Sequence, residues 1–195
     1  MKKLVAMTVL ALGTSAMAQV VLPPHATTYT GFSRGFSFTA GSSFQITNLT
    51  LPTDAQAGLT EETYLVDING TTAYYANGPY AGGNINVTAG DIVTIVGNWT
   101  PGAAGGAGNF TASNSYASGG GTYSTMIEGV STTLFRAGVQ WDIGDPVGGP
   151  AALGTIFNGL SGSIGRINMY TQVPAPGSLA LLGMGGLVAS RRRRG

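Results

Sequence analysis

The sequence predicts an all-β fold, a single β-sandwich or jelly-roll-like domain, and three observations carry that prediction. Glycine supplies 32 of the 195 residues, and Thr, Ser and Asn are abundant where Glu and Lys are few, which disfavours helices. Apolar residues recur with a period of two in several short segments, as they do in strands with one buried face. Turn residues separate these segments, so about seven to nine short strands are expected.

Two strands are expected early in the domain. Residues 30–40 carry three aromatic residues at even spacing, which places them on one face of a strand: Phe32, Phe36 and Phe38. In the next segment the apolar period changes phase, from Phe44 and Ile46 to Leu49 and Leu51. A slip of one residue moves side chains to the other face of a strand, so a β-bulge is predicted near Asn48.

The strongest hairpin signal is Asn69-Gly70, which lies between residues 64–68 and 71–75. This pair tolerates the positive φ angles of a type I′ turn, so the two flanking segments are expected to pair. Further along the chain, residues 84–87 lead through Ala89-Gly90-Asp91 into the apolar run 92–99. A short apolar run bounded by turn residues is typical of a buried strand.

The C-terminal half is predicted to hold two strands and two long loops. Residues 132–141 form the first strand, with Phe135, Ala137, Val139 and Trp141 on one face and Arg136 and Gln140 on the other. Residues 163–172 form the second. Residues 100–121 and 142–162 are rich in glycine and are therefore predicted to be surface loops.

Both ends of the chain carry targeting patterns. Lys2 and Lys3 precede an apolar segment at 4–12, and Ala16-Met17-Ala18 is a small-x-small site. This pattern predicts a signal peptide over residues 1–18, with cleavage before Gln19. The domain that remains is predicted to span residues 19–172.

The other end combines a proline-containing segment, an apolar stretch and a basic terminus. Residues 178–190 would form a helix of roughly 20 Å, shorter than the ~30 Å hydrocarbon core of a bilayer, so we expect a marginal transmembrane helix. Four arginines follow, which resist translocation and hold this end in the cytoplasm: Arg191, Arg192, Arg193 and Arg194. A short core helix with a basic C-terminus is the alternative interpretation.

This order of parts resembles the PEP-CTERM sorting domain of exported bacterial proteins, over residues 173–195. Four residues stand where that family has its Pro-Glu-Pro motif, with Ala in place of Glu: Val173, Pro174, Ala175 and Pro176. The resemblance implies that exosortase, a transpeptidase-like membrane enzyme, cuts near the motif. It also implies passage from the inner membrane to the cell surface or extracellular matrix.

Charge and composition exclude several classes of function. Without the two terminal segments, the basic residues that remain are Arg34, Arg136 and Arg166, and all eight acidic residues remain as well. The net charge of this part of the chain is therefore 3 − 8 = −5. Nucleic acid is therefore not an expected partner. The chain has no cysteine, which excludes disulfides and thiol nucleophiles. The only histidine, His25, lies near the predicted mature N-terminus, and nothing in the sequence positions it in a Ser-His-acid triad.

Three other groups of residues are candidate sites. Glu61 and Glu62 are neighbours on a strand and face opposite sides, unlike a glycosidase pair. Asp142 and Asp145 could ligate Ca²⁺, although ordinary turn acids explain them better. Aromatic side chains could stack on a sugar. The candidate sugar-binding group is three tyrosines that are expected to be exposed: Tyr74, Tyr75 and Tyr80.

The sequence therefore predicts an exported surface or matrix protein without catalytic activity, cofactor or metal. Its expected partners are an exosortase-like enzyme and, transiently, the inner membrane. The alternative is a carbohydrate-binding module or adhesin that binds extracellular polysaccharide. A secreted hydrolase ranks third because the sequence lacks an acid/base constellation.

Overall fold

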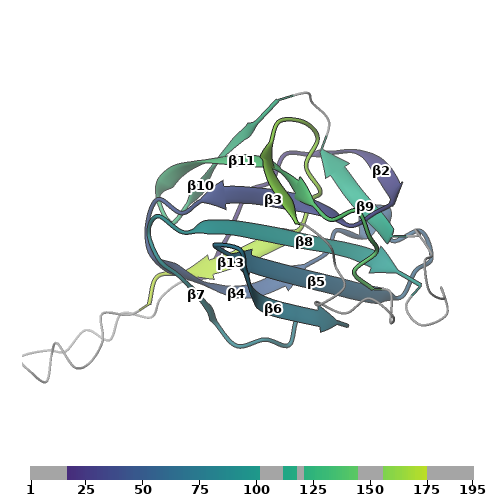
Figure 1. Ribbon diagram of the computed structural model, residues 1–195, viewed down its shortest axis with the longest axis horizontal. Coiled ribbons are helices and arrows are strands. Elements are labelled where there is room, and N and C mark those ends of the chain that lie inside the picture. The colour runs from purple at the N-terminus through teal and green to yellow at the C-terminus, as the bar shows by residue number, and fades with distance from the viewer. Residues whose placement is uncertain (1–16, 102–111, 118–120, 145–155, 175–195) are drawn as a thin grey trace, which may run out of the picture. The chain divides into compact units, whose positions relative to one another are not determined.

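The computed structural model describes residues 17–101, 112–117, 121–144 and 156–174, whose strands form two antiparallel sheets (Figure 1). The four-stranded sheet has the order β1 (Ala18–Gln19), β13 (Asn168–Gln172), β4 (Phe44–Thr50) and β7 (Ile85–Val87). The main path of the nine-stranded sheet is β10 (Tyr123–Ile127), β11 (Val130–Gly138), β3 (Arg34–Thr39), β8 (Ile92–Thr100), β5 (Glu61–Ile68) and β6 (Thr71–Asn77).

Three strands of the larger sheet lie off this path. β12 (Phe157–Leu160) pairs with β11, and β9 (Ala112–Ala117) pairs with both β8 and β2 (His25–Gly31). A single-turn 3-10 helix, η1 (Thr53–Ala55), follows β4. The prediction of an all-β fold is confirmed.

Both sheets contribute to one hydrophobic core. Phe44, Ile46 and Met169 come from the four-stranded sheet, and Phe36, Phe38, Tyr64 and Ile95 come from the nine-stranded sheet. In Figure 1, β4 and β13 lie behind β5 and β8, with this core between them. Burial of apolar surface contributes about 25 cal/mol per Å², and in a chain without disulfides it is the main source of stability.

The structure confirms the predicted turn and bulge. Asn69 and Gly70 have φ angles of 54° and 82°, the two positive values that a type I′ turn needs, and the Gly70 amide donates to Asp67 Oδ1 at 2.8 Å. In β4, Asn48 pairs with Tyr170 while Ile46 pairs with the next residue of β13. Thr47 is therefore the additional residue of a bulge.

Three predictions about strands and loops were wrong. Residues 30–40 are not one strand, because the chain turns between β2 and β3, at residues 32–33. The predicted loop 100–121 contains β9, all of whose residues are buried. Its polar side chains hydrogen-bond to backbone carbonyls, Ser113 to Ala55 at 2.6 Å and Asn114 to Phe32 at 2.9 Å. These bonds allow a polar segment to be buried. The other predicted loop, 142–162, contains β12.

A second, smaller hydrophobic cluster covers the opposite face of the nine-stranded sheet. It contains Leu65, Val96, Val139 and Ile143, and it lies opposite the main core because neighbours along a strand face opposite sides. The predicted apolar face of residues 132–141 packs here in part, since Val139 and Trp141 belong to this cluster. The central strands are consequently apolar on both faces.

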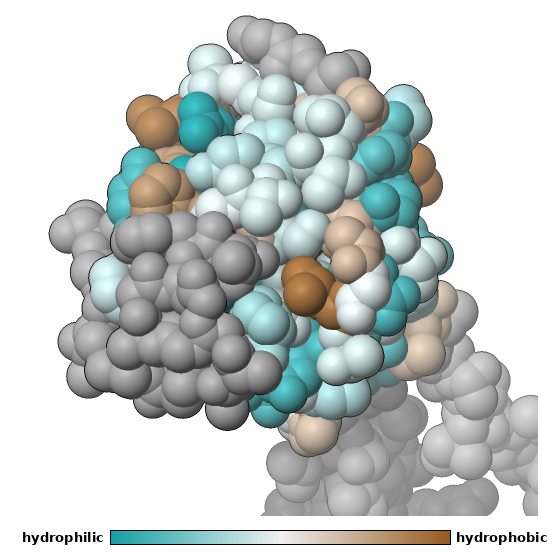
Figure 2. Space-filling view, turned by 90° about the vertical axis from the view of Figure 1, so that its right-hand side faces the viewer, coloured by the Kyte–Doolittle hydropathy of each residue, from teal (hydrophilic) through white to brown (hydrophobic). Residues whose placement is uncertain are grey.

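Residues 17–173 form one compact unit. Figure 2 shows one face of it, on which the described residues are mostly of intermediate or hydrophilic character and the apolar patches are small and separate. Within the described ranges, no helix has the length and apolar character that a bilayer crossing requires. The helix predicted at 178–190 and most of the predicted signal peptide lie outside those ranges.

Candidate functional site

The two segments predicted to be processed join the domain at neighbouring strands. Ala18 and Gln19 of β1 pair with Thr171 and Tyr170 of β13, and the amide of Val20 donates to the Met169 carbonyl at 2.9 Å. The predicted cleavage site after Ala18 therefore lies beside the C-terminal end of β13. The β13 residue that pairs with Ala18, Thr171, is two residues before Val173. The described residues next to the two segments thus lie on adjacent strands of the four-stranded sheet.

The predicted sorting motif lies only partly within the described residues. Val173 is 49% exposed, as a recognition segment must be. Ala175, Pro176 and the four terminal arginines lie outside the described ranges. Ala16 of the predicted signal cleavage site lies outside them too.

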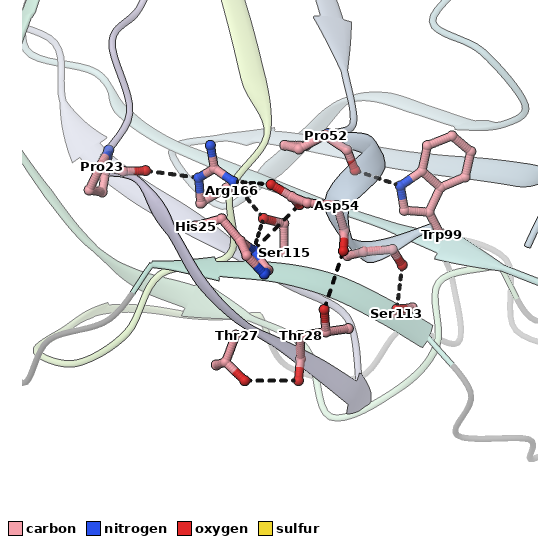
Figure 3. Close-up of polar contacts among 11 residues, drawn as sticks. Pro23, His25, Thr27, Thr28, Pro52, Asp54, Trp99, Ser113, Ser115 and Arg166 are labelled. Atoms are coloured by element: carbon pink, nitrogen blue, oxygen red, sulfur yellow. Dashed lines mark hydrogen bonds and ion pairs between the residues drawn. The ribbon is translucent and has the colours of Figure 1, made fainter. Parts of the chain in front are cut away.

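His25 belongs to a polar cluster that joins four separate parts of the chain (Figure 3). Its Nδ1 atom lies 3.0 Å from Ser115 Oγ and 3.5 Å from Asp54 Oδ1. Arg166 donates from Nη1 to Asp54 Oδ2 at 2.7 Å and to Ser115 Oγ at 2.8 Å. Its Nε atom donates to the Pro23 carbonyl at 2.8 Å. The cluster thus fastens β2, η1 and β9 to the segment before β13.

These residues include a serine, a histidine and an aspartate, but their geometry is not that of a catalytic triad. In a triad one ring nitrogen faces the nucleophile and the other faces the acid. Here the same nitrogen of His25 faces both Ser115 and Asp54. Arg166 also donates to both partners, so it holds the serine oxygen and the carboxylate in place. Sequence reasoning missed this cluster because its members are far apart in the chain.

The three tyrosines of the predicted sugar platform do not share one face of the sheet. Tyr74 and Tyr80 contact each other, with ring centroids 4.7 Å apart, and pack against the main core. Tyr75 packs against the second cluster on the opposite side of the sheet, and its hydroxyl donates to the Ile143 carbonyl at 2.7 Å. Burial, with a smaller contribution from Tyr74, raises the pKa of Tyr80 to about 12.

Two of the acidic candidates, Asp142 and Glu62, have structural partners. Asp142 is buried and accepts hydrogen bonds from the Gly144 amide at 2.9 Å and from Asn98 Nδ2 at 3.1 Å. Asp145 lies outside the described residues. Glu62 accepts a hydrogen bond from the Tyr64 hydroxyl at 2.5 Å. Burial, followed by this bond, raises the pKa of Tyr64. Among the described residues, no three His, Cys, Asp or Glu side chains gather as metal ligands would.

Comparison with known families identifies the C-terminal segment. Residues 172–194 match the PEP-CTERM protein-sorting motif. The resemblance inferred from the sequence is therefore confirmed, and the motif implies an exported protein that an exosortase-like enzyme processes. Neither the curated proteins nor the solved structures contain a match to this chain.

Proposed function

We propose that this chain is an exported, non-enzymatic protein of the cell surface or extracellular matrix. Its tail holds it briefly at the inner membrane until an exosortase-like enzyme cuts near Val173. The observation that carries the proposal is the PEP-CTERM match at residues 172–194. We assign the part that remains, residues 19–172, to a β-sandwich of jelly-roll type.

The arrangement of the domain's ends supports this route. Cleavage before Gln19 removes only one residue of β1, and Gln19 keeps its partner Tyr170. Val20 is buried and keeps its backbone bond to Met169. Removal of the chain beyond Val173 leaves β13 entire. The Gln19–Tyr170 pair and the Val20–Met169 bond that tie the two ends together are thus independent of both terminal segments.

The polar cluster supports the non-enzymatic part of the proposal. General acid-base catalysis needs a group within hydrogen-bond reach of a substrate, whereas Arg166 engages both Asp54 and Ser115. These bonds fasten strands together and satisfy the groups that a hydrolase would use. The carbohydrate-binding alternative loses its single platform, since Tyr75 lies on the opposite face from Tyr74 and Tyr80.

Fractionation of the native host, with mass measurement of the C-terminus, tests the proposal. Replacement of the four arginines with serine removes the charges that oppose translocation, so unprocessed protein should be released from the inner membrane. Replacement of Pro174 and Pro176 with alanine should instead leave the anchor intact and alter the extended segment that the enzyme recognises. Uncut protein should then accumulate in the inner membrane.

The two variants serve as controls for each other, because each alters one part of the tail and leaves the other part intact. A mature surface protein that still ends at Gly195 would contradict the proposal. Such a result would make the segment a permanent anchor.

A further inference from the structure

A cavity of about 370 Å³ lies beside β11 and β12, within the size range of small-molecule sites. Two polar residues and two apolar residues line it: Arg136, Gln140, Phe157 and Leu160. All four belong to the described residues. Leu160 is 49% exposed, so the domain leaves part of an apolar side chain at the cavity accessible to solvent.

Arg34 lies next to this cavity and is almost completely buried, with 3% of its surface exposed. Its Nη1 atom donates to the carbonyls of Ser33 at 3.0 Å and Val139 at 2.5 Å. Its Nη2 atom donates to Gln140 Oε1 at 3.0 Å. The guanidinium also lies over three aromatic rings, at 5.1 to 5.3 Å from their centroids: Tyr29, Phe32 and Phe157.

All of these partners are neutral. A buried cation without a counterion costs several kcal/mol, and contacts with aromatic faces offset only part of that cost. In the described part of the chain, the one carboxylate within ion-pair distance of a basic group is Asp54, which pairs with Arg166 and His25. The positive charge of Arg34 is therefore not neutralised within the described domain.

Arg136 adds a second cation at the same place. Its guanidinium lies 5.7 Å from the Phe157 ring centroid, so both arginines contact one ring. Among the described residues, the side chain of Arg136 has no hydrogen-bond or ion-pair partner, and its Nε atom is buried. Arg34 Nε and the Tyr116 hydroxyl are also buried without a bond of good geometry. Three buried polar groups thus lack the partners that such groups normally have.

Gly138 allows the arrangement to form. A Cβ atom at this position would lie 3.0 Å from Arg34 Cδ and 3.1 Å from Phe157 Cζ. Both contacts are tighter than ordinary van der Waals distances. The absence of a side chain at Gly138 lets the arginine and the ring lie against β11.

We propose that this cavity binds a ligand that carries an oxyanion group, a carboxylate or a sulfate ester, on an apolar body. The guanidinium of Arg136 supplies N–H donors in the planar fork that suits a carboxylate or sulfate. The buried guanidinium of Arg34 adds positive electrostatic potential at the cavity. Phe157 and Leu160 contact the apolar body of the ligand. Residues 19–172 as a whole carry a net charge of −5, so two adjacent cations are a local exception in an acidic domain. The inference depends on the cavity alone and not on the sorting proposal.

Calorimetric titration of the full chain in detergent micelles tests the proposal. The probes are trigalacturonate, a neutral galactose trisaccharide of the same length, sodium benzoate and inorganic sulfate. We expect trigalacturonate or benzoate to bind, more weakly at high salt, and the neutral trisaccharide not to bind. The better ligand of the two identifies the source of the oxyanion as a sugar acid or a small aromatic acid.

Two variants at the cavity and one matched control sharpen the test. Arg136→Gln should weaken binding at least about tenfold without a change in thermal unfolding, because the Arg136 side chain makes no hydrogen bond to another described residue. Gln140→Glu should abolish binding, because the new carboxylate would pair with Arg34. Arg166→Gln removes the same charge away from the cavity and should leave the affinity unchanged.

All of these proteins keep the arginines of the tail, so anion binding there is common to every titration. Measurable and equal affinity for the acidic and neutral trisaccharides would overturn the proposal, and so would the failure of both trigalacturonate and benzoate to bind. Unchanged binding in Arg136→Gln would overturn it as well, and so would binding of inorganic sulfate alone.

Discussion

Arg166 and Arg136 are both partly buried arginines of one small domain, and the fold treats them differently. Arg166 donates to a carboxylate, a hydroxyl and a carbonyl, all within 2.8 Å. The Arg136 side chain contacts an aromatic ring at a cavity and has no hydrogen-bond partner among the described residues. Arg166 has the partners of a structural residue, whereas the donors of Arg136 are left for a ligand.

The difference shows that burial and charge alone do not identify a site. Both regions hold an arginine, an aromatic or apolar surface and polar neighbours. What separates them is whether the carboxylate comes from the chain, as Asp54 does for Arg166. A charge that the fold neutralises contributes to stability, and a charge that it leaves unpaired can attract a ligand of opposite sign.

The largest loss of stability is expected from a substitution in the cavity region. Gly138→Ala places a methyl group 2.6 Å from the Ser33 carbonyl oxygen, as well as against Arg34 and Phe157. The backbone must shift, so we expect a loss of about 2–3 kcal/mol in the free energy of unfolding. Urea denaturation measures this loss. Gly83→Ala, where a Cβ has open space, is the control, and equal stability of the two variants would refute the packing described at Gly138.

Loss of the paired arginine should have the next largest effect on stability. Arg166→Gln breaks the bonds to Asp54, Ser115 and Pro23, and we expect the free energy of unfolding to fall by about 1–2 kcal/mol. A double-mutant cycle with Asp54→Asn should give a coupling energy of about 0.5–1 kcal/mol. Additive effects of the two substitutions would show that the ion pair contributes nothing. Arg136→Gln in the same assay should change stability by less than about 0.5 kcal/mol.

The titration of Tyr116 reports on the cavity arginines. Burial raises the pKa of this phenol, and the positive charges of Arg34 and Arg136 oppose the increase. Arg136→Gln should therefore raise the pKa of Tyr116 further, as measured by phenolate absorbance. Because the folded pKa lies above the unfolded value of 10.0, the related stability is complete below pH 10 and is lost as the pH rises through the folded pKa. A lower pKa in the variant would contradict the proximity of the charges.

The smallest effect is expected at His25. His25→Ala removes one contact each from Ser115 and Asp54, but Arg166 still donates to both. The free energy of unfolding should fall by less than about 0.5 kcal/mol, as measured by urea denaturation. A loss as large as that of Arg166→Gln would mean that the histidine, and not the arginine, holds the cluster together.

The sequence predicted the parts of the fold that local patterns determine. Asn69-Gly70 identified a hairpin because its residues tolerate positive φ, and the change of apolar phase around Asn48 identified a bulge. It did not reveal β9, because a polar strand can be buried only when distant carbonyls such as those of Phe32 and Ala55 accept its hydrogen bonds.

The site was harder to predict than the fold for the same reason. The sorting motif is contiguous, so its order of parts could be recognised. Arg34, Arg136 and Phe157 come from three strands, and no local sequence pattern indicates that both arginines contact the Phe157 ring. The one signal that could have drawn attention to them was composition, since the predicted mature domain has only three arginines and no lysine.

The contrast between the two arginines is tested most directly by NMR spectroscopy of the full chain in detergent. The Nε–H signals of the arginines are followed during a titration, and single Arg→Lys variants assign them. The Nε atom of Arg136 is buried without a partner, whereas that of Arg166 donates to Pro23. As the tighter-binding ligand of the two, trigalacturonate or benzoate, is added, the Arg136 signal should shift until it saturates and the Arg166 signal should stay in place. A shift of the Arg166 signal, or of the tail arginine signals alone, would contradict the account.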